Sequence, residues 1–264
     1  IIFVIFCIKK NNFSFFKNFY FYIFLFFWCY LLLNSLFNNF NLDSLKISFF
    51  YIRFGIFIIA VIALLDVDHK FLKNFFYCTF LCFLVLIIDG FFQYFNGENI
   101  IGFKSPVKNR VSSFFGDEMV VGSFLSRLFP LLFALIVFKK LKNNYLLYLT
   151  LILFILTDVL VYVAGERLAI ANLLIGSIFI ILLINKYKYL RLLSLIVSIL
   201  IIIFISLNND VVKSRVIDKT INDLNIKDGS PSYIISSNYE DIFETAGQIF
   251  LDNPVFGVGP KIYR

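Results

Sequence analysis

Residues 145–163 read YLLYLTLILFILTDVLVYV, an apolar run with a single charged residue. A run of about 20 apolar residues is long enough to cross the hydrocarbon of a bilayer as an α-helix. The strands of a membrane barrel would instead show about ten residues of alternating polarity. This stretch therefore predicts a membrane-spanning helix.

Similar apolar runs follow one another along most of the chain. Of its 264 residues, 60% are hydrophobic, 20% are aromatic and 37 are Phe, and the mean hydropathy is +0.88. This composition excludes an ordinary soluble domain and predicts an all-α integral membrane protein. We expect residues 1–207 to form a polytopic helical bundle of one truncated and seven full spans: 1–8, 18–37, 48–66, 74–95, 118–138, 145–163, 168–185 and 189–207.

The remaining residues, 208–264, are predicted to be the first part of a large loop outside the membrane. Within it, residues 236–260 read SSNYEDIFETAGQIFLDNPVFGVGP, with apolar residues at helical spacing after a Ser237–Glu240 capping box. We expect a short amphipathic helix that Pro254 ends, followed by a turn in which Gly257 and Gly259 permit backbone angles that other residues resist. The chain starts inside an apolar run and stops just after this turn, so we expect a fragment of a longer protein.

Lysine and arginine mark the sidedness of the bundle, because cytoplasmic loops hold the excess of these residues. One side carries eleven: Lys9, Lys10, Lys17, Lys70, Lys73, Lys139, Lys140, Lys142, Lys186, Lys188 and Arg191. The other side carries five: Lys46, Lys104, Lys108, Arg110 and Arg167. The first side is predicted to be cytoplasmic. The connection 96–117, the corner 165–167 and the segment from residue 208 would then face outward.

Six ionisable residues are predicted in the outer half of the bilayer or at its outer edge, and none deep in the inner half. They are Arg53, Asp89, Arg127, Asp158, Glu166 and Arg167. Arg127 lies several residues into its span, where insertion scales charge about 2.5–3.5 kcal/mol for an arginine near the centre. We expect that cost to be compensated by use in function or by a partner such as Asp158 or Asp89.

Small and polar residues share one face of the helix that carries Arg127. They are Gly122, Ser123, Ser126 and Pro130. Because small-residue faces pack inside bundles, we expect Arg127 to point into a protein-lined cavity. A similar face follows Arg167 and consists of Gly165, Ala169, Asn172 and Gly176. The two helices are expected to approach each other closely.

The sequence lacks the residue patterns that several other function classes require. The net charge of +7 forms no basic stripe or reader motif, so no nucleic-acid partner is expected. His69 reads as a solvated loop residue, and no cluster has metal-ligand spacing, so neither a metal nor a cofactor is expected. P-loop, Rossmann and G-x-S-x-G motifs are absent from the sequence. The four cysteines lie in or beside apolar runs and are expected to pack there as free thiols: Cys7, Cys29, Cys78 and Cys82.

Arginines in the outer half of a membrane cavity suit a dianionic lipid headgroup, because a guanidinium matches phosphate oxygens in pairs. A polyprenyl pyrophosphate fits this description. Arg127 is the arginine that burial alone favours for this role, whereas the position of Arg110 in the outward loop does not decide it.

Three segments together resemble the O-antigen ligase and polymerase family of bacterial membrane glycosyltransferases. Residues 110–130, RVSSFFGDEMVVGSFLSRLFP, are similar to the family's pattern leading from an outer loop into a span. Residues 165–170, GERLAI, resemble the family's small-residue and arginine corner before a span. Residues 246–264, AGQIFLDNPVFGVGPKIYR, resemble its helix, N-P and G-x-G-P element in the large periplasmic loop.

The resemblance implies a metal-independent, inverting transfer of a glycan from undecaprenyl pyrophosphate at the periplasmic face of the bacterial inner membrane. The acceptor would be lipid A core for a ligase, or another lipid-linked repeat for a polymerase. Arg110 and Arg167 match the family arginines that hold the pyrophosphate, with Arg127 as an assisting charge. The turn that shapes the loop would consist of Pro254, Gly257, Gly259 and Pro260. The catalytic histidine is expected beyond Arg264, so the fragment is expected to be inactive alone.

Two further functions stay open beside the ligase and polymerase alternatives. A transporter or flippase for lipid-linked oligosaccharide would need charges along a path through both leaflets, and the predicted lack of charge in the inner half counts against it. A non-catalytic membrane subunit is the other.

Overall fold

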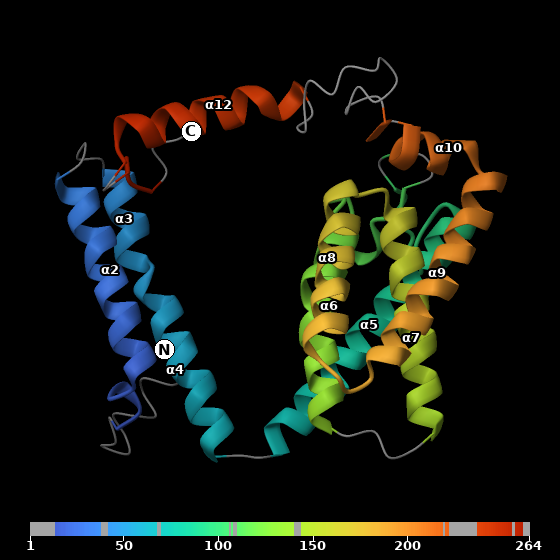
Figure 1. Ribbon diagram of the computed structural model, residues 1–264, viewed down its shortest axis with the longest axis horizontal. Helices are drawn as coiled ribbons and strands as arrows, with labels where there is room; N and C mark the ends of the chain where they lie inside the picture. The colour runs from blue at the N-terminus through green and yellow to red at the C-terminus, as the bar shows by residue number, and fades with distance from the viewer. Residues whose placement is uncertain are drawn as a thin grey trace. The chain divides into compact units, whose positions relative to one another are not determined.

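The computed structural model describes residues 14–37, 42–67, 70–105, 107, 110–139, 144–218, 220–221, 237–254 and 257–260. These residues are almost entirely helical (Figure 1), and within them no β-strand occurs apart from an isolated bridge between Glu98 and Lys104. The all-α class predicted from composition is confirmed.

The elements follow one another along the chain with short connections. Their bounds are η1 Ser14–Phe16, α2 Phe19–Phe37, α3 Leu42–Phe50, α4 Ile52–Val67, α5 Lys70–Asn96, η2 Ser113–Phe115, α6 Val121–Lys139, α7 Asn144–Ala164, α8 Arg167–Leu183, α9 Lys188–Asn208, α10 Asp210–Lys213, η3 Ser214–Asp218 and α12 Ser237–Asp252.

Six helices of the described chain are long and apolar enough to cross a membrane. They are Phe19–Phe37, Leu42–Asp66 (α3 with α4), Lys70–Asn96, Val121–Lys139, Asn144–Ala164 and Lys188–Asn208. The protein is therefore a multi-pass membrane protein. The predicted span 168–185 corresponds to α8, whose 17 residues extend only about 25 Å. The predicted remnant 1–8 lies outside the described residues.

The chain forms two compact units, each described here by itself. Unit 1 comprises Ile1–Phe71 and Ile235–Arg264, and unit 2 comprises Leu72–Ile234. The predicted boundary at residue 207 separates membrane helices from a loop. The compact units are divided at different positions, after Phe71 and after Ile234.

In unit 1, serine hydroxyls join α2 to α3. Ser35 and Ser48 share a 2.5 Å hydrogen bond, Ser44 donates to Ser35 at 3.2 Å, and the Trp28 indole donates to the Ser48 carbonyl at 2.9 Å. Polar side chains in apolar helices find partners on neighbouring helices, since lipid offers none.

The predicted amphipathic helix in unit 1 is confirmed as α12. The side chains of Ser237 and Glu240, which form the predicted capping box, are not among those that the structure describes. Beyond the helix, Gly257 and Gly259 have φ of +63° and +92°, a region that favours glycine. The expected glycine requirement of this turn is confirmed.

In unit 2, helices α5 to α9 enclose a core of large apolar side chains, in which α7 is the most deeply buried element. The fully buried members include Phe83, Phe129, Phe133, Phe154 and Leu160. Helix α6 packs against α8 through small residues, as predicted. A Cβ added to Gly122 would lie 3.4 Å from Ala169, and one added to Gly176 would lie 3.4 Å from Pro130. This close approach brings together the ends of both helices that carry the candidate site.

Candidate functional site

Two buried residues near the end of α5 hold the polar segment that follows it. The Asp89 carboxylate accepts hydrogen bonds from the Ile100 amide at 2.9 Å and the Ser113 hydroxyl at 2.5 Å. One turn later, the Gln93 carbonyl accepts from the amides of Ser112 and Ser113 at 2.8 and 2.7 Å. Asp89 and Gln93 are 0% and 2% exposed. Both ends of the segment are therefore fastened to one helix.

A third polar side chain, Asn99, closes this segment on itself. Its oxygen accepts from the amides of Ile101 and Phe103 at 3.1 and 2.7 Å, and its nitrogen donates to the Ser113 carbonyl at 3.2 Å. Ser113 has φ of +51°, a left-handed conformation that costs a non-glycine residue roughly 1–2 kcal/mol. Its amide, carbonyl and hydroxyl are all bonded, so the surrounding contacts maintain it.

The fixed segment carries Arg110 to the corner between α7 and α8. The Arg110 Nε donates to the carbonyl of Ala164, the last residue of α7, at 3.1 Å. The next residue, Gly165, has φ of +73°, and a Cβ there would lie 2.8 Å from Arg215 Cδ and 3.8 Å from Arg110 Nε. The guanidinium groups of Arg110 and Arg215 therefore lie close together beside Gly165.

Sequence reasoning missed Arg215, which lies in the π-helical turn η3 beyond the last span. Its pKa is lowered, chiefly by burial and further by the positive charge of Arg110. The charged form is thus disfavoured in the folded chain, and an anion placed between the two guanidinium groups would relieve the repulsion. One signal was available, since Arg215 is the only arginine between Arg191 and Arg264.

The corner also holds Glu166 and Arg167. The Glu166 carboxylate accepts from the amides of Gly122 and Ser123 at 2.8 and 3.0 Å, and from the Ser123 hydroxyl. It caps the positive N-terminal end of α6, a favourable place for a carboxylate. Arg167 is the first residue of α8 and is half-buried. The fold thus brings the corner residue Arg167 to the same end of unit 2 as Arg110.

Arg127 is not in this arrangement, and its predicted orientation is wrong. It is exposed, whereas Leu125, Ser126 and Phe129 on the same helix are buried. At 100° per residue, Arg127 lies nearly opposite Leu125 and Phe129, whose bulk occupies the inward face. The small-residue pattern suggested the packing of α6 correctly but did not account for these two apolar residues.

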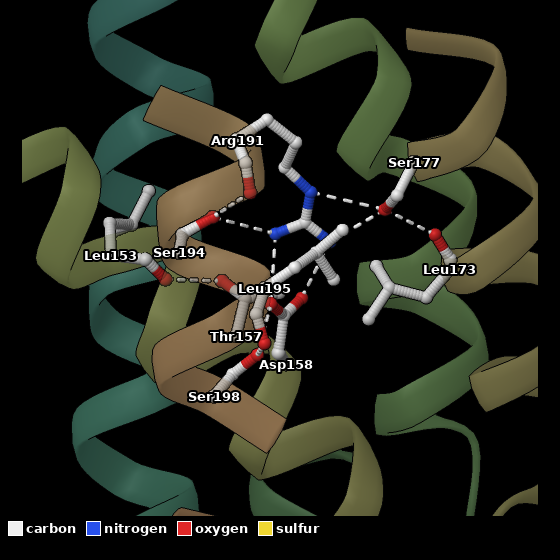
Figure 2. Close-up of polar contacts among 9 residues, drawn as sticks. All are labelled: Leu153, Thr157, Asp158, Leu173, Ser177, Arg191, Ser194, Leu195 and Ser198. Atoms are coloured by element: carbon white, nitrogen blue, oxygen red, sulfur yellow. Dashed lines mark hydrogen bonds and ion pairs between the residues drawn. The ribbon is translucent and has the colours of Figure 1, made fainter. Parts of the chain in front are cut away.

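The charge inside unit 2 belongs instead to Arg191 of α9 (Figure 2). Its guanidinium, 0% exposed, forms a bidentate ion pair with Asp158 of α7: Nη1 to Oδ2 at 2.8 Å and Nη2 to Oδ1 at 2.9 Å. From the sequence, Arg191 was expected in the cytoplasmic connection and Asp158 was a possible partner of Arg127. Both assignments are corrected, because Arg191 is the fourth residue of α9 and faces inward.

Serine hydroxyls complete this network. Ser177 of α8 accepts from Nε and Nη2 of Arg191 at 3.1 and 2.6 Å, and Ser194 accepts from Nη1 at 3.2 Å. Ser198 donates to Asp158 at 3.0 Å, as Figure 2 shows. All five guanidinium N–H donors are thereby used. The network of Asp158, Arg191 and the serines joins α7, α8 and α9. It leaves Arg191 no N–H donor for a ligand.

The remaining predicted residues have mixed outcomes. Cys29, Cys78 and Cys82 are free, as expected, but they are exposed on their helices and do not pack in the core. Cys7 and His69 lie outside the described residues. The described residues contain no group of three or more potential metal ligands. The turn with Pro254, Gly257, Gly259 and Pro260 belongs to unit 1, and its role in shaping a substrate-binding loop stays a prediction.

Fold and site together define a multi-pass, all-α membrane protein with a guanidinium-rich corner at one end of unit 2. The sequence matches no protein-family model, no curated protein and no solved structure at a significant level. The assignment to the O-antigen ligase and polymerase family therefore stays a prediction from the three sequence segments.

Proposed function

We propose that this protein is an O-antigen ligase- or polymerase-like glycosyltransferase that binds a polyprenyl-pyrophosphate-linked glycan at the corner formed by Arg110, Arg167 and Arg215. The observation that carries the proposal is the meeting of Arg110 and Arg215 over Gly165. Two guanidinium groups held close together match the paired oxygens of a pyrophosphate, which supplies more than one negative charge.

The framework around the arginines supports a binding role. Arg110 donates to the carbonyl of Ala164 and lies within the segment that Asp89 and Gln93 fasten to α5. A preorganised cation loses little entropy on binding, so more of its interaction energy appears as affinity. The Glu166 carboxylate at the same corner accepts hydrogen bonds from the backbone amides of Gly122 and Ser123 in α6.

In the proposed reaction, the bond between the anomeric carbon of the glycan and the pyrophosphate oxygen breaks while the acceptor hydroxyl oxygen bonds to that carbon. Negative charge grows on the leaving pyrophosphate, and fixed guanidinium groups stabilise that charge most strongly in the transition state. The acceptor proton must pass to a base within hydrogen-bond reach. The sequence resemblance assigns this role to a histidine beyond Arg264, so the arginines supply donor binding and leaving-group stabilisation.

A binding experiment tests the donor site directly. The full chain in detergent would be titrated with farnesyl pyrophosphate as the probe, alongside Arg110→Ala and Arg167→Ala variants. Charge-assisted hydrogen bonds contribute roughly 1.5–3 kcal/mol each, so we expect each variant to bind about tenfold more weakly or worse. Lys104→Ala is the matched control, since Lys104 is an exposed cation on the same outer segment. Equal binding by wild type, both arginine variants and the control would refute the donor site.

A gene deletion in the source cell separates the two transferase reactions. Loss of a polymerase leaves lipopolysaccharide with a single repeat. Loss of a ligase leaves bare core while lipid-linked polymer accumulates. Unchanged lipopolysaccharide in the deletion strain would contradict both.

The alternative function is transport or flipping of a lipid-linked oligosaccharide. The Asp158–Arg191 pair favours it, because the pair is buried within the bundle and intramembrane charges often line transport paths. Reconstituted vesicles distinguish the two: movement of a labelled polyprenyl-linked sugar across the bilayer without transfer to an acceptor would favour transport.

A further inference from the structure

Three lysines from three elements lie at the end of unit 2 opposite the arginine corner, where α5 begins and α6 ends. Lys73 precedes Tyr77 by one helical turn in α5, Lys139 is the last residue of α6, and Lys186 lies in the turn between α8 and α9. We refer to these three lysines with Tyr77 as the lysine end.

The lysine end is connected by close contacts. The Lys139 ammonium lies 3.7 Å from the centre of the Tyr77 ring and 4.3 Å from that of Phe76. Lys186 donates to the carbonyl of Val137, two residues before Lys139, at 3.0 Å. The positive groups therefore lie around the last turn of one helix, whose terminal carbonyls favour cations.

The Lys139 ammonium is buried, and in the described part of the chain it contacts the Tyr77 side chain and the Phe76 ring but no carbonyl or carboxylate oxygen within hydrogen-bond geometry. A buried ammonium without a counter-ion is unfavourable, and contacts with aromatic side chains compensate it only in part. An anion in front of Tyr77 would add attraction for this charge.

Carboxylates are missing from this half of unit 2. The sequence contains no Asp or Glu in residues 70–88, 119–157 or 168–209. Asp158, the first acidic residue after residues 119–157, is already paired with Arg191. The protein therefore offers the lysines no acidic side chain of these segments as a counter-charge.

Exposed aromatic residues place this end at the level of lipid headgroups. Tyr77, Tyr145, Tyr148 and Tyr189 are 47%, 84%, 62% and 74% exposed on the corresponding ends of α5, α7 and α9. Tyrosines gather at membrane–water interfaces. Phe75 and Phe138 beside the lysines are exposed as well, and they offer apolar contact for acyl chains.

We propose that the lysine end binds the headgroup of an anionic phospholipid. Exposed Lys73 and Tyr77 would donate hydrogen bonds to the lipid phosphate, while Lys139 and Lys186 add positive charge behind the Tyr77 ring. This matches the general preference of basic sites at helix ends for acidic lipids. The inference does not depend on the proposed transferase function.

Native mass spectrometry of the full chain tests the proposal, with phosphatidylglycerol and phosphatidylcholine of equal chain length as probes. We expect retention of phosphatidylglycerol over phosphatidylcholine. Each lysine near the surface contributes about fivefold to anionic-lipid affinity, so Lys73→Gln and Lys139→Gln should each weaken phosphatidylglycerol binding about fivefold. Lys73→Arg should retain wild-type binding.

Lys104→Gln, an exposed lysine on the outer segment, is the matched control and should bind as wild type. Lys73 is exposed, so its variant tests the proposal even if Lys139→Gln misfolds. Equal retention of the two lipids, or unchanged binding by Lys73→Gln, would overturn the proposal. Displacement of the lipid by an equal concentration of glycerol 3-phosphate would also overturn it, because a free phosphate would then be the ligand.

Discussion

Replacing Asp158 should destabilise the protein more than any surface change, because it would leave the buried guanidinium of Arg191 without its counter-ion. Asp158 accepts two of the five Arg191 hydrogen bonds, and Arg191 is 0% exposed. Removing one partner of a buried ion pair costs about 3–5 kcal/mol. We therefore expect Asp158→Leu, and equally Arg191→Met, to lower the free energy of unfolding by about that amount.

The double variant Asp158→Leu/Arg191→Met should restore most of that loss. Both charges are then gone, and an apolar pair of similar volume is often as stable as a buried ion pair. The serines keep acceptors of their own: Ser177 donates to the Leu173 carbonyl at 2.5 Å and Ser198 to that of Leu195 at 2.9 Å, as Figure 2 shows. The two substitutions should therefore be strongly non-additive.

Unfolding of the full chain by sodium dodecyl sulfate in mixed micelles, followed by circular dichroism, measures these free energies. Arg127→Met is the matched control, since exposed Arg127 should change stability by no more than about 0.5 kcal/mol. The reasoning is refuted if the double variant loses the sum of the two single losses, or if Asp158→Leu is no worse than the control.

Three further predictions concern the arginine corner of unit 2 and the segment that holds it. Gly165→Ala should cost roughly 1–2 kcal/mol or more, because φ is +73° and the new Cβ would lie 2.8 Å from Arg215 Cδ; unfolding as stable as wild type would contradict this. Gln93→Leu should cost about 1–3 kcal/mol for each buried amide of Ser112 and Ser113 left without its acceptor, and protection of these amides from hydrogen exchange should fall; unchanged protection would count against the framework. Arg215→Gln should change the stability of the ligand-free chain by less than about 1 kcal/mol, because burial and the nearby charge of Arg110 lower the pKa of Arg215 and so offset what its contacts contribute. A clearly larger loss of stability in that variant would contradict this.

Much of the fold could be predicted because it depends on composition and local pattern. Apolar length indicated the membrane helices, and spacing indicated α12 and the close packing of α6 on α8. The predicted span 168–185 agrees with α8, Arg167–Leu183, to within two residues at each end, and it runs past Leu183 because the apolar run continues beyond the point at which the backbone turns toward α9. Hydropathy alone does not register such a turn.

The charges were harder to place, because an amphipathic pattern does not tell which of two competing faces is buried. Leu125 and Phe129 exclude Arg127 from the interior of α6. Arg191 lies close enough to the end of α9 to be read as a loop residue, and only the packed structure reveals its pairing with Asp158, 33 positions earlier in the sequence. Arg215 is distant in sequence from Arg110, so no local motif joins the two.

The central claim is that Arg215, which no motif indicates, belongs to the same anion site as Arg110. Titration of the full chain with farnesyl pyrophosphate, comparing wild type, Arg110→Ala, Arg215→Ala and the double variant, tests it most directly. We expect Arg215→Ala to bind about tenfold more weakly or worse, and the double variant to show a non-additive loss, since the two groups share one ligand. Wild-type affinity in Arg215→Ala would contradict the claim.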